Sequence, residues 1–276
     1  MSDIITTWIM GIFKSVNSLG GAVISTPDSY NPTIYKGIMT IQENVIMPVA
    51  LIVLAIFLLL ELYNITTRTD MMGSNSFEIP FRCMFKFAIC KLALESTHLI
   101  LTAMFEVSQD LIMGIDKILT GSNGIDYEGS RQIIYELVDK AGFFEQILMS
   151  GAILVIWILT MVIALVVDAI VIGRMIEMYV YIGIAPLPLA TFPNAEQSQI
   201  AKGFLKSFMA VCIQGVLIFI TIGILRILFN NIVDIGSISS NESLQEMLWK
   251  CAGYAIILLI AILNTGRWSK SICNAI

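Results

Sequence analysis

The chain has 276 residues, of which 57% are hydrophobic and only 13% are charged, and its formal net charge is −5. This composition excludes an ordinary soluble domain and indicates a polytopic membrane protein. The acidic balance argues against a basic surface that holds nucleic acid directly, and the five cysteines lack metal-ligand spacing, so we expect free thiols and neither a metal nor a cofactor.

Residues 1–43 are predicted to form an extracytoplasmic amphipathic helix followed by a loop. Apolar side chains recur there at helical spacing, and Trp8, Ile12 and Phe13 share the apolar face. We expect this face either to anchor the chain to a membrane surface, the more common role, or to contact another subunit. Asp3 lies where a signal peptide would carry basic residues, so insertion is expected to depend on internal spans.

Residues 44–107 are predicted to hold the first two transmembrane helices. The first, 45–63, has about the 20 apolar residues that cross a hydrocarbon core. The second, 81–107, carries a stripe of polar side chains at helical spacing, namely Lys91, Glu95, His98, Thr102 and Glu106. Because ionisable groups facing lipid are costly, the stripe is predicted either to line a cavity or to be satisfied against another helix, with Glu95 pairing with Lys91 or His98. A helix lying flat on the membrane is a third alternative.

Residues 108–146 are predicted to form an acidic extracytoplasmic segment. The transmembrane core, 147–265, then opens with the most apolar span of the chain. Near the end of that span, Asp168, Arg174 and Glu177 follow one another on a continuing helix. They are expected to form a local ion-pair cluster or, in a sharper interpretation, a gate or a partner contact.

The proline cluster of the core dominates the predicted architecture. Pro186, Pro188 and Pro193 each remove a backbone donor, so an undisturbed helix cannot continue beyond Ala185. Broken backbone at membrane depth must be buried by protein or reached by water. Residues 175–192 are therefore predicted to form a re-entrant segment that lines a cavity.

The basic residues predict the topology. Arg267 and Lys270 in the tail, 266–276, place the C-terminus in the cytoplasm, because basic residues favour that side. With a re-entrant proline segment, the chain becomes an all-α polytopic protein with about five transmembrane helices and an outside N-terminus. Counting that segment as a sixth span would force one group of basic residues outside.

The layout and two stretches of sequence resemble a known family. An outer N-terminal helix and a very apolar third span precede IGIAPLPLATF and, after a polar turn, AKGFLKSFMAVCIQGVLIFI. Over residues 40–265 the chain resembles the TrbL-type conjugal transfer proteins, in the compact form of Gram-positive conjugative elements. These are polytopic plasma-membrane channel subunits of type IV secretion systems.

The resemblance implies a set of partners. Such a subunit assembles with copies of itself, with a bitopic scaffold protein, with a secretion ATPase and with a coupling protein. Together they pass a relaxase with its single-stranded DNA, or protein effectors, across the lipid bilayer. Homo-oligomers are expected, because a path for so large a cargo cannot fit between the helices of one chain of this size.

Two other functional classes, a secondary transporter and a membrane enzyme, are alternatives to a channel subunit. A secondary transporter of a small polar or ionic substrate would also use broken helices and charged residues at membrane depth, but no second proline-broken segment forms an inverted repeat. An enzyme is not expected, since the sequence has one histidine and lacks GxSxG, HExxH and glycine-rich phosphate motifs. Substituting His98 or Glu95 should abolish a transporter's activity and be partly tolerated in a channel scaffold.

Overall fold

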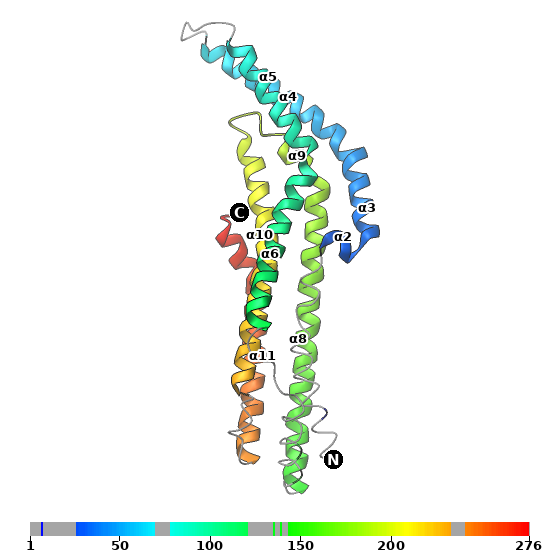
Figure 1. The fold of residues 1–276 in the computed structure, drawn as a ribbon, viewed down its shortest axis with the longest axis vertical. Helices are drawn as coiled ribbons and strands as arrows, with labels where there is room; N and C mark the ends of the chain where they lie inside the picture. The colour runs from blue at the N-terminus through cyan, green and yellow to red at the C-terminus, as the bar shows by residue number, and fades with distance from the viewer. Residues whose placement is uncertain are drawn as a thin grey trace. The chain divides into compact units, whose positions relative to one another are not determined.

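The computed structural model of the chain is drawn in Figure 1 and describes residues 7, 26–69, 78–120, 135, 139, 143–232 and 241–275. Within these residues every regular element is a helix, which confirms the predicted all-α class. The elements in chain order are α2 (Pro27–Tyr30), α3 (Pro32–Ile41), the π-helix η2 (Gln42–Ile46), α4 (Met47–Thr69), α5 (Glu78–Glu95), α6 (Thr97–Thr120), α8 (Phe143–Ile184), α9 (Pro186–Leu189), α10 (Ser198–Ile232) and α11 (Asn241–Ile272).

Some predictions fall outside the described residues. The predicted contact residues Trp8, Ile12 and Phe13 lie there, as do residues 121–134 of the predicted acidic segment 108–146. These predictions stay as they are. The first residues of the acidic segment, 108–120, are instead the end of α6.

The chain divides into two compact units. One consists of Ser25–Gln109, Arg174–Gln214 and Arg267–Ile276, and we call it the proline-turn unit. The other consists of Met1–Ile24, Asp110–Gly173 and Gly215–Gly266. Helices α6, α8, α10 and α11 each contribute residues to both units, and every site described below lies within the proline-turn unit.

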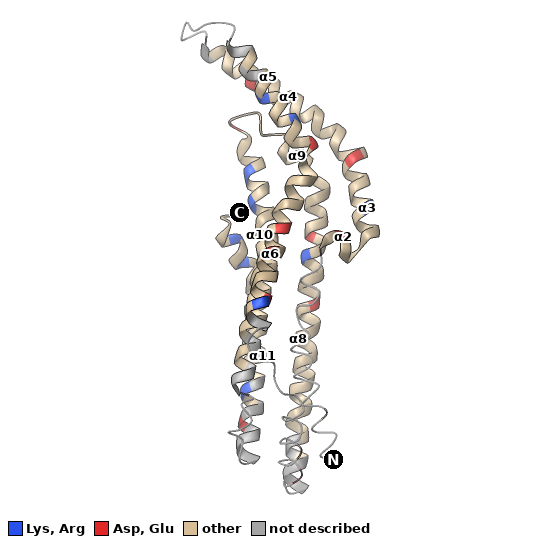
Figure 2. Cartoon of the chain, in the orientation of Figure 1, with Lys and Arg blue, Asp and Glu red and all other residues tan. Residues whose placement is uncertain are grey.

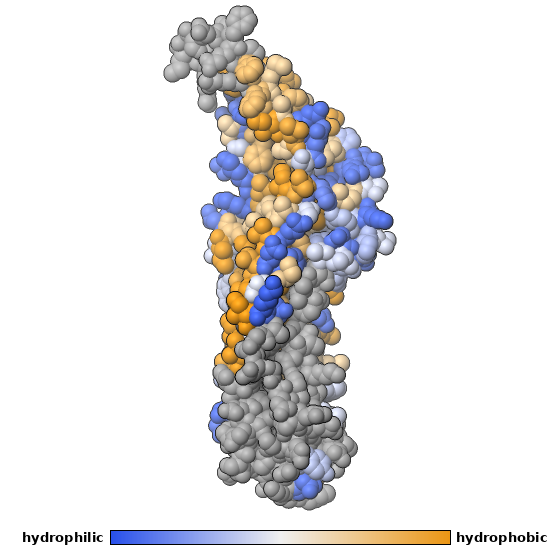
Figure 3. Space-filling view, in the orientation of Figure 1, coloured by the Kyte–Doolittle hydropathy of each residue, from blue (hydrophilic) through white to orange (hydrophobic). Residues whose placement is uncertain are grey.

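Five helical stretches of the described chain are long and apolar enough to cross a membrane: Pro32–Thr67, Thr97–Ile118, Ser150–Ile184, Ser198–Ile224 and Ala252–Ile272. Large apolar side chains on them face outward, such as Ile52, which is 63% exposed, and Leu165, which is 66% exposed. Figure 3 shows apolar residues over much of the described surface, and Figure 2 shows how few charges interrupt the helices. Such a surface requires lipid, which confirms the prediction of a multi-pass membrane protein.

The first two described helices begin with local sequence signals. Thr26 caps α2 and Asn31 caps α3, and in both cases proline occupies the first helical position. A Thr-Pro and an Asn-Pro pair thus place two helix starts within six residues. The Tyr179 hydroxyl of α8 donates to the Pro27 carbonyl at 2.6 Å, which fixes α2 against α8.

The second predicted span, 81–107, is divided into two helices. A turn at Ser96 separates α5 from α6, and the buried Thr97 hydroxyl donates to the Leu94 carbonyl at 2.6 Å. Side-chain bonds of this kind compete with the helical ladder and bend helices. The stretch that can cross a membrane, Thr97–Ile118, therefore starts later than predicted and belongs to α6 alone.

The third span is longer than predicted. Helix α8 has 42 residues and thus a length of about 63 Å, roughly twice the thickness of a hydrocarbon core. Residues 175–184, the first part of the predicted re-entrant segment 175–192, are the last residues of this helix. The helix is interrupted at Ala185, immediately before Pro186, where the prolines predicted an interruption.

Apolar side chains of three helices pack together in the proline-turn unit. The buried members of this cluster are Leu101 and Phe105 of α6, Met175, Met178, Tyr179 and Ile182 of α8, Ala185, and Phe208, Val211 and Cys212 of α10. Tyr181 adds edge-to-face contacts with Phe204 and Phe208, with ring centroids 5.4 and 6.1 Å apart. These contacts hold the end of α8 against the start of α10.

Helix α3 approaches α8 closely at Gly183. A Cβ atom at this position would lie 3.3 Å from Cγ2 of Ile38, which is tighter than ordinary packing. Glycine therefore permits the contact between these two helices.

Candidate functional site

The chain between α8 and α10 satisfies its own backbone in a series of tight turns. Ala190 N–H donates to the Pro186 carbonyl at 3.0 Å, and Thr191 N–H donates to the Pro188 carbonyl at 3.2 Å. Asn194 then receives bonds on its side-chain oxygen from the N–H groups of Glu196 and Gln197, both at 3.0 Å. The proline break is thus an ordered turn whose donors find partners close by in the sequence.

Other helices cover this turn. Leu189 and Ala190 pack against Ala50 and Leu54 of α4, Leu94 of α5 and Ala201 of α10 in a second buried apolar cluster. Pro186 and Pro193 are buried and Pro188 is half-buried. The turn is therefore covered by protein, which is one of the two conditions under which irregular backbone is tolerated in a membrane.

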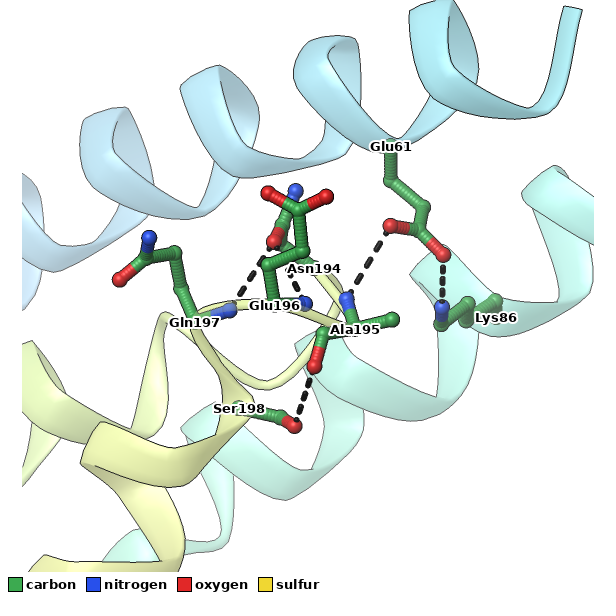
Figure 4. Close-up of polar contacts among 7 residues, drawn as sticks. All are labelled: Glu61, Lys86, Asn194, Ala195, Glu196, Gln197 and Ser198. Atoms are coloured by element: carbon green, nitrogen blue, oxygen red, sulfur yellow. Dashed lines mark hydrogen bonds and ion pairs between the residues drawn. The ribbon is translucent and has the colours of Figure 1, made fainter. Parts of the chain in front are cut away.

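A buried carboxylate joins three segments at the turn, as Figure 4 shows. Glu61 of α4 is only 7% exposed, and it accepts from Lys86 Nζ of α5 at 2.6 Å and from Ala195 N–H at 3.1 Å. A charge in such surroundings is stable only because it is paired and hydrogen-bonded. Glu61 thus ties the proline turn to the α4–α5 hairpin.

The predicted polar stripe is distributed over two helices. Lys91 and Glu95 lie on α5, are half-exposed, and form an ion pair with each other at 3.7 Å. His98, Thr102 and Glu106 lie on α6, and all three line a cavity. The turn at Ser96 separates the two groups, so Lys91 and Glu95 pair within α5 while the other three residues lie at the cavity on α6.

The cavity has a volume of about 390 Å³ and lies between α2, α3, α6, α8 and α10. Its apolar lining residues, which we call its floor, come mainly from α6, α8 and α10, and its polar groups come from the α2 region, from Tyr35 of α3 and from α6. The lining residues are Thr26, Pro27, Asp28, Tyr35, His98, Leu101, Thr102, Phe105, Glu106, Met178, Ile182 and Phe208. Pro186, Pro188 and Pro193 do not line it, so the predicted cavity lining by the proline segment is not seen at this cavity.

Hydrogen bonds shape the polar part of the cavity. The Tyr35 hydroxyl and His98 Nε2 share a hydrogen bond, which links α3 to α6. Hydrogen bonding with the Thr26 side chain holds the pKa of the Asp28 carboxyl below its ordinary value, so Asp28 is ionised at neutral pH. The volume and the mixture of an apolar floor with a few polar groups are typical of a small-molecule site.

The three charged residues predicted near the end of the third span have different surroundings. Asp168 is exposed and Glu177 is half-buried, whereas Arg174 is only 3% exposed. Nε and Nη1 of Arg174 have no hydrogen-bond partner. The predicted ion-pair cluster around Arg174 is not found among the described residues.

Several residues of the site were not predicted from the sequence. Glu61 had a signal, since it is the one carboxylate in the otherwise uncharged stretch 45–63. Asp28 and Tyr35 had none, because the cavity that they line also needs segments far away in the sequence. Asn194 had a local signal, since a loop asparagine commonly accepts hydrogen bonds from backbone N–H groups that follow it closely. Among the described residues, no group of three His, Cys, Asp or Glu side chains could hold a metal ion.

The comparison with protein families identifies the chain. The family model described as "TrbL/VirB6 plasmid conjugal transfer like protein" matches residues 12–186. The chain belongs to this family. The match confirms the predicted TrbL-type relationship and contains the helices from α2 to α8 together with Pro186. Residues 187–265, which also contributed to the predicted resemblance, lie beyond it.

The other two comparisons found nothing, since no curated protein and no solved structure matches the chain. As a TrbL/VirB6-family protein, the chain is a membrane subunit of a conjugal transfer system, in which it works with other subunits. Type IV secretion and conjugation are therefore confirmed as its setting, and the plasma membrane as its location.

Proposed function

We propose that this chain forms, as a homo-oligomer, the membrane channel or scaffold through which a conjugative type IV secretion system passes relaxase-bound single-stranded DNA or proteins. The observation that carries the proposal is the family match over residues 12–186 in a chain whose described residues include five helical stretches long and apolar enough to cross a membrane. The partners proposed with it are a bitopic scaffold protein, a secretion ATPase and a coupling protein. In this role the chain is not an enzyme, and it supplies a path rather than a reaction.

The size of the described cavity supports an oligomer. A volume of about 390 Å³ suits one small molecule, and a strand of DNA with an attached protein is far larger. The cargo path is therefore proposed to lie between copies of the chain. Exposed apolar residues along the helices provide surface that either lipid or a second copy can cover.

The distribution of charge supports a cytoplasmic C-terminus and an outside N-terminus. Residues 25–109, 174–214 and 267–276 contain ten basic and nine acidic residues, a net charge of +1. The rest of the chain contains six basic and twelve acidic residues, and its net charge of −6 completes the total of −5. Because basic residues are retained on the cytoplasmic side, the C-terminal tail with Arg267 and Lys270 is proposed to face the cytoplasm.

Conjugation itself tests the proposal. An in-frame deletion of the chain should reduce transfer of the element to background, and expression of the intact chain in trans should restore it. Cross-linking in membranes should then trap dimers and larger species of this chain together with the proposed partners. Unchanged transfer in the deletion strain would refute the role, and a strictly monomeric protein in functional membranes would refute the homo-oligomer.

A secondary transporter is a second candidate, because of the cavity. Asp28, His98 and Glu106 surround a space of the size that a small polar substrate needs. The two candidates differ in their sensitivity to these groups. Transfer should survive Glu106→Gln or His98→Ala at a reduced level if the chain is a channel subunit, whereas near-complete loss of an uptake activity would favour the transporter.

A further inference from the structure

A layer of buried polar side chains lies next to the floor of the cavity in the proline-turn unit. Phe105 of α6, Met178 of α8 and Phe208 of α10 line that floor. Gln109, Arg174 and Cys212 each lie one helical turn from these three residues, on the same helix faces. Because α6 and α10 run opposite to α8 (Figure 1), all three steps lead in the same direction along the helices.

The donors in this layer are buried and lack partners. Arg174 is 3% exposed and Gln109 is 6% exposed. Nε and Nη1 of Arg174 and Nε2 of Gln109 have no hydrogen-bond partner. Buried polar atoms in native proteins nearly always have one, so three unpaired N–H-bearing atoms in one layer call for an acceptor that is not part of the described chain.

The neighbouring carboxylates do not supply this acceptor. On α6, Glu106 and Asp110 flank Gln109 but are exposed, and on α8 Glu177 is half-buried. No ion pair joins Arg174 to any of them in the described structure. Cys212, which is fully buried and close enough to Arg174 to interact with it electrostatically, is a poor acceptor as a neutral thiol. A guanidinium stays charged, and a buried charge without a counter-ion is costly.

We propose that Arg174 and Gln109 form a binding site for a phosphate group, which supplies the missing negative charge and acceptor oxygens. The planar fork of a guanidinium matches the oxygens of a phosphate and binds two of them at once. Gln109 Nε2 adds a donor from the facing helix. The phosphate comes either from a lipid headgroup or from free phosphate.

Purified full-length protein in a maltoside detergent and a phosphate-free buffer tests this site. The unfolding midpoint is measured after addition of inorganic phosphate, or of phosphatidylglycerol, and native mass spectrometry counts the bound molecules. Sodium chloride at equal ionic strength controls for screening, and diacylglycerol with the same acyl chains controls for the lipid tails. We expect one of the two phosphate sources to raise the midpoint by several degrees and to remain bound at a stoichiometry of about one.

The variants link the effect to the site. Arg174→Met and Gln109→Leu should both reduce the stabilisation at least severalfold, whereas Arg267→Met, which removes an exposed arginine of the same unit, should leave it unchanged. A response to inorganic phosphate alone identifies a free anion, and a response to phosphatidylglycerol alone identifies a headgroup. The proposal is overturned if neither source stabilises the protein, if chloride or diacylglycerol does so equally, or if Gln109→Leu responds like the wild type. That variant decides the matter even if Arg174→Met fails to fold.

Discussion

The two buried charged residues Glu61 and Arg174 of the proline-turn unit differ in their hydrogen-bond partners. Glu61 is 7% exposed and accepts hydrogen bonds from Lys86 Nζ and from Ala195 N–H. Arg174 is 3% exposed, and two of its three nitrogens have no partner. The chain thus compensates one buried charge completely and leaves the other uncompensated.

The difference separates a structural from a binding role. A buried carboxylate of α4 that accepts from α5 and from the proline turn stabilises the fold, because it satisfies donors from two other segments at once. A buried guanidinium without partners reduces stability unless something else binds it. The predictions below test this distinction, beginning with the largest expected effect.

Removing the compensated charge should have the largest effect. Glu61→Ala leaves Lys86 and Ala195 N–H without their shared acceptor, and we expect a loss of about 2–4 kcal/mol in the free energy of unfolding. Because the Lys86 side chain is 36% exposed, water recovers part of its interaction and the loss should fall in the lower half of that range. Denaturant unfolding in detergent measures it. Glu61→Gln, which still accepts from Ala195 N–H, should lose less, and equal losses in both variants would contradict this interpretation.

Removing the uncompensated charge of Arg174 should change the free energy of unfolding in the opposite direction. In phosphate-free detergent, Arg174→Met replaces an unpaired guanidinium by an apolar side chain of similar length within an apolar cluster. We expect the free energy of unfolding to rise by about 1–3 kcal/mol. The same unfolding experiment checks this, with Arg267→Met as the exposed control. A clear destabilisation by Arg174→Met alone would mean that this guanidinium is already paired.

In the proline turn, the uncharged side chain of Asn194 accepts backbone hydrogen bonds, as the charged Glu61 does. Asn194→Ala removes the acceptor of two backbone N–H groups that precede α10, and we expect a loss of about 1 kcal/mol, as for other helix caps. Asn194→Asp keeps the acceptor and should retain most of the stability. Protease sensitivity between residues 190 and 198 should rise only in the alanine variant, so equal sensitivity in both variants would argue against a capping role.

The smallest effect is expected at the exposed edge of the cavity. The folded state lowers the pKa of Asp28, chiefly through hydrogen bonding with Thr26, so it favours the ionised carboxylate. The resulting stabilisation is present above the ordinary pKa of an aspartate and is lost as the pH falls through the lowered value. Wild type should therefore exceed Asp28→Asn in unfolding midpoint at pH 7, and the difference should shrink toward about pH 3. A difference that does not change with pH would exclude this carboxylate as its source.

The sequence anticipated the features that depend on local composition. Long apolar stretches predicted five membrane-crossing helices, and the prolines predicted a break just after Ala185, because a proline lacks the N–H that the helix needs. Features that depend on pairing between distant segments were not predictable. Glu61 and Ala195 are 134 residues apart, and nothing local to either residue indicates that they meet.

The polar stripe on α5 and α6 separates what the sequence predicts from what the tertiary structure decides. Its periodicity was visible in the sequence, yet the turn at Ser96 divides it, so that Lys91 and Glu95 pair on the surface while His98, Thr102 and Glu106 line the cavity. Likewise, Arg174 was a recognisable charge at the end of a span, but only the tertiary structure decided that it would be buried without a partner. Composition and proline placement determine which segments are helical and apolar, since these are properties of single segments. The arrangement of facing helices decides which polar groups are satisfied, because a hydrogen bond needs two groups at the right distance.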